Sequence, residues 1–236
     1  MITLAESYSK GITIAVLFII GIVGAYYISN PILVDRLILS SLMVSGLYCL
    51  KNKDVLGALI IVFGGQLIYE LVTSLHSGGF LWDAACYSLA LFSVWKAYID
   101  KLRIPTFILL ILCISAEMFW HFNDYDGPSL SWYWVTISTC LLQRHLLIMR
   151  CHYTITFLKK NARPTLLDHS LKTYCIIPII IEHLNITEYL ARHVLDINSL
   201  FVYQIYPWLQ QFAAIILVIT IILFAYKAEK IRVMEA

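Results

Sequence analysis

Charged side chains are scarce in this sequence, and their scarcity decides the class of protein. Asp, Glu, Lys and Arg make up only 14% of the 236 residues, and 60% are hydrophobic. Soluble domains carry about a quarter charged residues, so we predict an integral membrane protein surrounded by membrane lipids. The formal net charge of +2 is far below that of a nucleic-acid-binding protein, and we expect no nucleic-acid partner.

Sequence motifs of cofactor sites are missing as well. The 6 cysteines form no C-x-x-C pair and no zinc-finger spacing with histidine, which favours small buried side chains. P-loop, Gly-rich dinucleotide and Ser-His-Asp patterns are absent. His76 and His121 fall near one membrane face and His145 and His152 near the other, which does not support a two-haem path across the membrane. We expect neither a haem nor a nucleotide cofactor.

Long apolar runs fill most of the chain. A crossing helix needs about 20 apolar residues, and runs bounded by charge, Pro or Gly predict an all-α polytopic transmembrane helix bundle that forms one membrane-embedded domain over residues 1–236. A further segment, about 171–184, is short and has Pro178 in its middle, so it could be a crossing helix, a broken helix or a re-entrant loop. The other predicted spans are about 11–29, 33–50, 55–76, 80–98, 104–122, 130–149 and 207–226.

The distribution of Lys and Arg decides whether segment 171–184 crosses. Basic residues near span ends stay on the cytoplasmic side. With eight crossings and an inner N-terminus, all 17 Lys and Arg residues except Arg36 and Arg192 lie inside. With seven crossings, Lys227, Lys230 and Arg232 would lie outside. We therefore predict eight spans in a cytoplasmic (inner or plasma) membrane, with both termini in the cytoplasm.

The linker at 150–170 faces the inner leaflet in this topology. It combines apolar residues with several cations, a pattern typical of an amphipathic helix at the membrane surface. Its cations could bind anionic lipid headgroups, or Arg150 could simply anchor the end of the sixth span. The headgroup candidates are Arg150, Lys159, Lys160 and Arg163.

The linker on the outer side, at 185–198, has a helical pattern of its own. Asn185 and Glu188 have the spacing of a capping pair. Apolar residues after them recur on one helical face, with charged residues on the opposite face. We predict a short interfacial helix here.

Acidic residues gather at the predicted outer ends of spans three to six. A charged side chain inside a span costs about 2.5–3.5 kcal/mol, so it usually faces protein or a water-filled cavity. Glu70 and Asp83 flank a tight turn, and Glu117 and His121 are four residues apart on one helix face. Trp120 and Trp132 lie beside them, and Asp124 and Asp126 follow in the loop.

This acidic group suggests a function that the sequence alone leaves open. It could form an outward-facing acidic and aromatic vestibule that binds or moves a small cation, a proton or a cationic solute. In that case Glu70 and Glu117 titrate, Asp83 and His121 are their partners, and Trp120 and Trp132 are walls.

Other interpretations use the same residues. Glu117 and His121 are candidate metal ligands, although the pair is a weak signal. The group could instead supply acid and base to an enzyme that acts on a lipid or lipid-linked substrate at the outer face. It could also only fix helix packing, as in a non-catalytic accessory subunit. The chain could form a homo-oligomer or join a larger membrane assembly.

Overall fold

The computed structural model describes residues 31–75, 79–123 and 130–235. Within these residues every regular element is a helix, which confirms the all-α prediction for this part of the chain. The helices are α2 (Pro31–Tyr48), α3 (Lys53–Ser74), α4 (Phe80–Lys96), α5 (Arg103–Phe122), α6 (Ser131–Leu158), α7 (Leu166–Tyr174), α8 (Ile176–Leu195) and α9 (Phe201–Glu235).

Three of these helices are long and apolar enough to cross a membrane. They are α3, α5 and the Phe201–Lys227 part of α9, and a shorter apolar helix covers Arg36–Tyr48. This composition is consistent with an integral membrane protein. Crossing by α2, α4, α6 and α8 remains a prediction, as does the orientation of the termini. The first predicted span, 11–29, lies outside the described residues.

Helix α6 is longer than the sixth predicted span, which ends near residue 149. It continues to Leu158 because no Gly or Pro interrupts the sequence from Ser131 onward. It ends at Lys159, which has the left-handed φ of 50°. The predicted inner linker at 150–170 is therefore divided between the end of α6, a connection over 159–165 and the start of α7. A capping box of Thr165 and Asp168 begins α7.

The predicted outer interfacial helix at 185–198 is not a separate element. Residues up to Leu195 belong to α8, which ends at Asp196 with a φ of 57°. The chain breaks earlier, at Cys175 between α7 and α8. Pro178 explains this position, because it has no N–H to donate to the carbonyl of Tyr174 and its ring crowds that carbonyl.

The capping pair predicted at Asn185 and Glu188 also has a different role. Both side chains are buried inside α8, and Glu188 caps the next helix instead. Its carboxylate accepts hydrogen bonds from the backbone N–H groups of Val202 at 3.0 Å and Tyr203 at 2.7 Å. The Ser199 hydroxyl donates a third at 2.9 Å. Glu188 thus satisfies donors that the first turn of α9 leaves without a helical partner.

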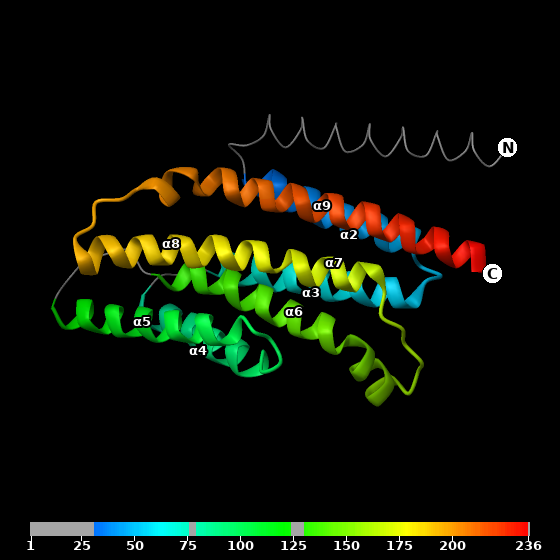
Figure 1. Cartoon of the computed structure of the whole chain (residues 1–236), viewed down its shortest axis with the longest axis horizontal. Coiled ribbons are helices and arrows are strands. Elements are labelled where there is room, and N and C mark those ends of the chain that lie inside the picture. The colour runs from blue at the N-terminus through cyan, green and yellow to red at the C-terminus, as the bar shows by residue number, and fades with distance from the viewer. Residues whose placement is uncertain (1–30, 76–78, 124–129, 236) are drawn as a thin grey trace.

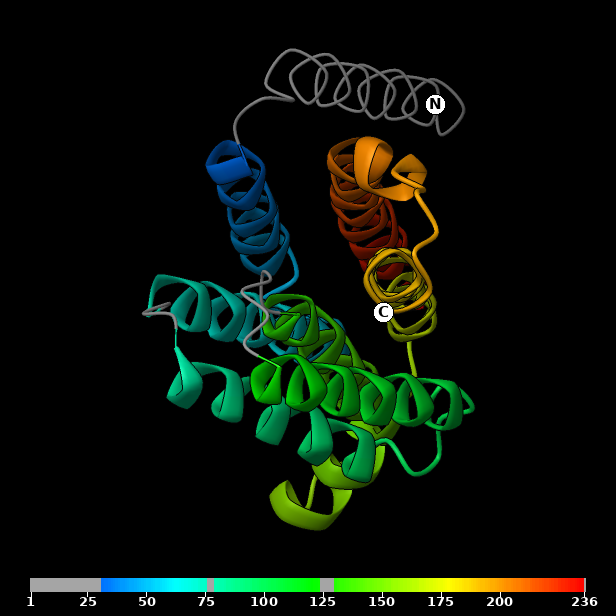
Figure 2. The same ribbon diagram turned by 90° about the vertical axis from the view of Figure 1, so that its left-hand side faces the viewer.

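The helices pack in an elongated bundle with α6 at its centre. Helix α6 contacts α3, α4, α7 and α8, while α9 contacts α2, α7 and α8. Figure 1 shows α2 and α9 along one side of the molecule and α4 and α5 along the opposite side. The view down the bundle in Figure 2 shows α7 and α8 below α9, away from α2. The core therefore lies around α6, between the α2–α9 pair and the α4–α5 pair.

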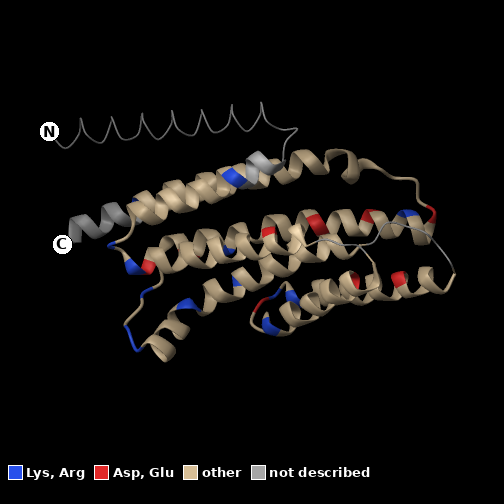
Figure 3. Ribbon diagram, turned by 180° about the vertical axis from the view of Figure 1, so that it is seen from behind, with Lys and Arg blue, Asp and Glu red and all other residues tan. Residues whose placement is uncertain are grey.

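The charges are distributed unevenly along the bundle. Figure 3 shows Lys and Arg concentrated around the end where α2 joins α3 and α6 joins α7. These connections carry Lys51, Lys159, Lys160 and Arg163. The opposite end contains the connection between α8 and α9 (Figure 1). Four of the cations predicted on the inner side therefore lie in connections at one end of the bundle, and the orientation of that end in a membrane remains a prediction.

Candidate functional site

A pocket of about 540 Å³ lies among α2, α3, α6, α7, α8 and α9. Its lining comes from the first halves of α6 and α9 and from the second half of α3. The pocket is therefore nearer to the end of the bundle that lies opposite the Lys- and Arg-rich connections. Polar side chains in its lining include Gln66, Tyr69, Thr136, Gln143, Tyr206 and Gln210.

Directly behind this lining is the carboxylate of Glu182 in α8. The side chain has 0% exposure. The Tyr206 hydroxyl donates to its two oxygens at 2.9 and 3.1 Å, and the Gln210 amide donates at 2.6 Å. The Thr136 side chain of α6 also interacts with it. All three partners line the pocket, so one layer of side chains separates the carboxylate from the open space.

The partners of Glu182 are neutral, which makes its burial unusual. In the described part of the chain the ion pairs use Arg144 and Arg150, and none includes Glu182. Buried charges in proteins are normally paired with an opposite charge or bound to a metal. Hydrogen bonds from the uncharged Tyr206 and Gln210 side chains compensate part of the cost and leave the negative charge unbalanced. Glu182 therefore needs either a proton or a cation nearby.

Two prolines lie on the pocket wall, Pro178 in α8 and Pro207 in α9. Pro207 is inside its helix and has no N–H to donate to the carbonyl of Tyr203, four residues earlier. Prolines are tolerated in membrane helices where neighbouring groups can satisfy the released carbonyl. Both prolines thus lie on the wall of the pocket that the partners of Glu182 also line.

Close contact between α3 and α6 positions one amide of the pocket. The Nε2 of Gln143 donates to the carbonyl of Val62 at 3.3 Å, and this side chain lies directly over Gly65. A Cβ at Gly65 would come within 2.5 Å of the Gln143 Cδ and would collide with its Nε2. At Gly64, by contrast, a Cβ would meet nothing within 4 Å. Gly65 is thus required for the observed position of Gln143.

Gly65→Ala should have a free energy of unfolding about 1 kcal/mol lower than that of Gly64→Ala, because Gln143 must move and lose its hydrogen bond to Val62. Gly64→Ala is the matched control. It adds the same methyl group one residue away and should leave stability unchanged or raise it by roughly 0.5–1 kcal/mol through helix propensity. Thermal unfolding in detergent micelles measures both. Equal midpoints of thermal unfolding for the two variants would show that Gly65 is not needed to make room for Gln143.

The structure places two of the sequence-predicted acidic residues near one tyrosine. Glu117 accepts a hydrogen bond from the N–H of Leu130 at 2.7 Å and also interacts with Tyr87 of α4. Asp83 acts electrostatically on Tyr87 as well. Glu117 therefore links α5 to α4 and to the residue preceding α6. Neither carboxylate lines the pocket.

The other predicted binding residues are dispersed. Glu70 is half-buried on α3. Helix α3 packs against α2, α6, α7 and α9, whereas α5 packs against α4 and α8. His121 is exposed near the end of α5. Trp120 is buried edge-on against Tyr189 of α8, and Trp132 lines the pocket. Among the described residues no group of three or more His, Cys, Asp or Glu side chains could hold a metal ion.

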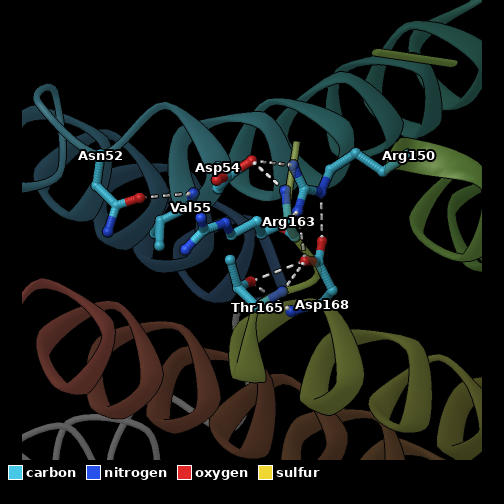
Figure 4. Close-up of polar contacts among 7 residues, drawn as sticks. All are labelled: Asn52, Asp54, Val55, Arg150, Arg163, Thr165 and Asp168. Carbon is cyan, nitrogen blue, oxygen red and sulfur yellow. Dashed lines mark hydrogen bonds and ion pairs between the residues drawn. The ribbon is translucent and has the colours of Figure 1, made fainter. Parts of the chain in front are cut away.

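The predicted headgroup cations also fall into two groups. Lys159, Lys160 and Arg163 have exposed side chains, and their contact with lipid remains a prediction. Arg150 is buried, and its guanidinium joins three parts of the chain (Figure 4). It donates to both oxygens of Asp168 at 2.7 Å, to Asp54 at 3.2 Å and to the carbonyl of Arg163 at 2.6 Å. These contacts hold α6, α3 and α7 together.

A second cation of α6 is also paired with an acid. Arg144 bonds to the buried Asp100, in the connection between α4 and α5, and to the carbonyl of Lys172 in α7. Asp100 in addition accepts from the N–H of Leu102. Arg144 and Arg150 thus have charged protein partners. Among the buried charged side chains in the described residues, Glu182 differs from both in having neutral partners.

Glu182 is the residue that our sequence reasoning missed, although a signal was present. No Asp, Glu, Lys or Arg occurs between Lys172 and Glu182 or between Glu182 and Glu188. An isolated acid inside an apolar segment is a candidate functional group by the cost of its burial alone. Comparisons with family models, curated proteins and solved structures gave no match.

Proposed function

We propose that this membrane protein binds a small cation within its helix bundle and exchanges it for a proton at Glu182. The observation that carries this proposal is a fully buried carboxylate whose three neutral partners all line one pocket. A bound cation would balance the carboxylate charge. When the cation leaves, a proton neutralises the same group, because an uncompensated charge is costly in an apolar interior.

The surroundings of Glu182 support a single titrating site. The described side chains that interact with it electrostatically include Tyr133, Cys140 and Tyr206, and these types are uncharged at neutral pH. His183, its neighbour in α8, is directed to Thr106 of α5 at 3.1 Å and to the carbonyl of Ile179 at 2.6 Å. Among these contacts, Glu182 is therefore the group that we propose exchanges the proton.

The proposal retains part of the vestibule predicted from the sequence. If the Lys- and Arg-rich end faces the cytoplasm, the pocket lies in the outer half of the bundle. Trp132 keeps its role as a wall. Glu182 replaces Glu70 and Glu117 as the group that carries the charge.

Cation-driven proton release tests the proposal. Tetramethylammonium, Na⁺ or K⁺ is added to purified, weakly buffered protein in detergent, and the pH change is recorded. We expect at least one of these cations to release up to one proton per chain, because cation and proton compete for one carboxylate. Glu182→Gln should release none, and Glu70→Gln and Glu117→Gln should behave like the parent. Unchanged release from Glu182→Gln, with loss in Glu70→Gln or Glu117→Gln, would instead support the vestibule.

A further inference from the structure

We propose that the cation taken by this pocket is an organic monocation, an ammonium group on an apolar or aromatic body. This inference rests on the proposed function and narrows its ligand. The volume of about 540 Å³ is within the range of roughly 300–1,000 Å³ that holds organic ligands. A monatomic cation instead requires a compact shell of oxygen ligands at about 2–2.6 Å, and the pocket is much larger than such a shell.

The walls have the surfaces that an organic cation requires. Aromatic rings come from four helices: Tyr69 from α3, Trp132 from α6, Tyr174 from α7 and Tyr206 from α9. A cation near the face of such a ring is attracted by the ring quadrupole, and the attraction is strongest where water is excluded. The same rings pack against methyl and methylene groups. The pocket can therefore hold both the charged group and its apolar substituents.

The charges of the pocket limit the ligand to one positive charge. The residues that line it in the described part of the chain include no Asp, Glu, Lys or Arg. Glu182, behind Tyr206 and Gln210, brings one formal negative charge into contact with this lining. One carboxylate balances one ammonium group, whereas an anion would be repelled and a dication would leave an excess charge in a low-dielectric site.

The amide side chains favour an ammonium that carries hydrogen atoms. Gln66, Gln143, Gln210 and Gln211 all line the pocket, and each amide has an oxygen that can accept N–H donors. Gln210 lies against the carboxylate at 2.6 Å. An ammonium group near Glu182 could therefore donate to amide oxygens while its apolar body lies along Tyr69 and Trp132.

Binding of a matched pair of probes tests the inference on the purified full-length protein in detergent. 2-Phenylethylammonium and 2-phenylethanol have nearly the same shape and differ in charge. Isothermal titration should show the ammonium binding at least about tenfold more tightly, and Na⁺ should show no binding at equal concentration. Trp132→Leu should weaken ammonium binding about tenfold. Trp95→Leu, at a tryptophan exposed on α4, should not change it.

The outcomes separate this inference from the proposed function. Equal affinity for the ammonium and the alcohol would overturn the inference, and this comparison needs only the parent protein. Binding of Na⁺ that depends on Glu182, without ammonium binding, would overturn it and leave the proposed function intact. Ammonium binding that is unchanged in folded Glu182→Gln would overturn both.

Discussion

Arg150→Ala should lower the free energy of unfolding by about 3–5 kcal/mol, because it leaves two carboxylates near the end of the bundle without their cation. The guanidinium donates through all three of its nitrogens, to Asp168, Asp54 and the carbonyl of Arg163. Burial alone would lower the pKa of Arg150, but the hydrogen bonds to Asp168 and Asp54 and the negative charge of Asp168 raise it. The side chain therefore remains charged in the folded protein, and the pairs are ionic.

Two further variants define what Arg150 contributes. Arg163→Ala removes a nearby exposed cation whose backbone, not its side chain, bonds to Arg150 and Asp54. It should change stability by less than about 0.5 kcal/mol. Arg150→Lys keeps the charge but loses the planar guanidinium, so its stability should lie between those of the parent and Arg150→Ala. Denaturant titration in micelles measures the free energy of unfolding of all three variants. Similar losses of stability in Arg150→Ala and Arg163→Ala would show that the paired guanidinium contributes little to stability.

Glu188→Ala should cost about 2 kcal/mol of folding free energy, because the start of α9 loses its capping carboxylate. Two backbone N–H groups and the Ser199 hydroxyl would lose their acceptor. Asp196→Asn is the control, since Asp196 is exposed at the same end of α8 and Asn also tolerates its left-handed conformation. A loss of the same size in the control would indicate a general charge effect.

The same carboxylate predicts a pH dependence. Glu188 lies beyond the seventh predicted span. Burial alone would raise its pKa, but the backbone N–H groups of Val202 and Tyr203, the Ser199 hydroxyl and the charge of Arg192 together lower it. Because its pKa is lower in the folded state, ionised Glu188 stabilises the protein fully above its unfolded-state pKa of about 4.3. This stabilisation is lost as the pH falls through the folded-state pKa. Between about pH 5 and pH 3 the parent should therefore lose more stability than Glu188→Gln.

Apolar runs were sufficient to predict the helical class, but they misplaced helix ends where charges are paired inside the protein. A span prediction stops near Arg144 and Arg150 because isolated cations are costly in a membrane. The structure continues α6 past both residues, and Asp100 and Asp168 from distant segments balance their charge. Such pairs depend on tertiary packing, which the sequence alone does not supply.

The candidate site shows the same limit. Glu182 could have been identified from its isolation in the sequence, but the hydrogen-bond donors around it could not. Tyr206 and Gln210 are 24 and 28 residues away and reach it only because α9 packs against α8. Local pattern also misassigned Glu188, because the spacing of a capping pair fits a residue that instead caps the following helix.

The cluster around Arg150 has a consequence for biosynthesis. The two acids it joins are separated along the chain: Asp54 precedes Arg150 by 96 residues and Asp168 follows it by 18. Because translation proceeds from the N-terminus, α3 and α6 are made before the stronger partner in α7 exists. Until the ribosome has added Asp168, the guanidinium can pair only with Asp54, so the contact that joins α3, α6 and α7 can form only after that residue has been made.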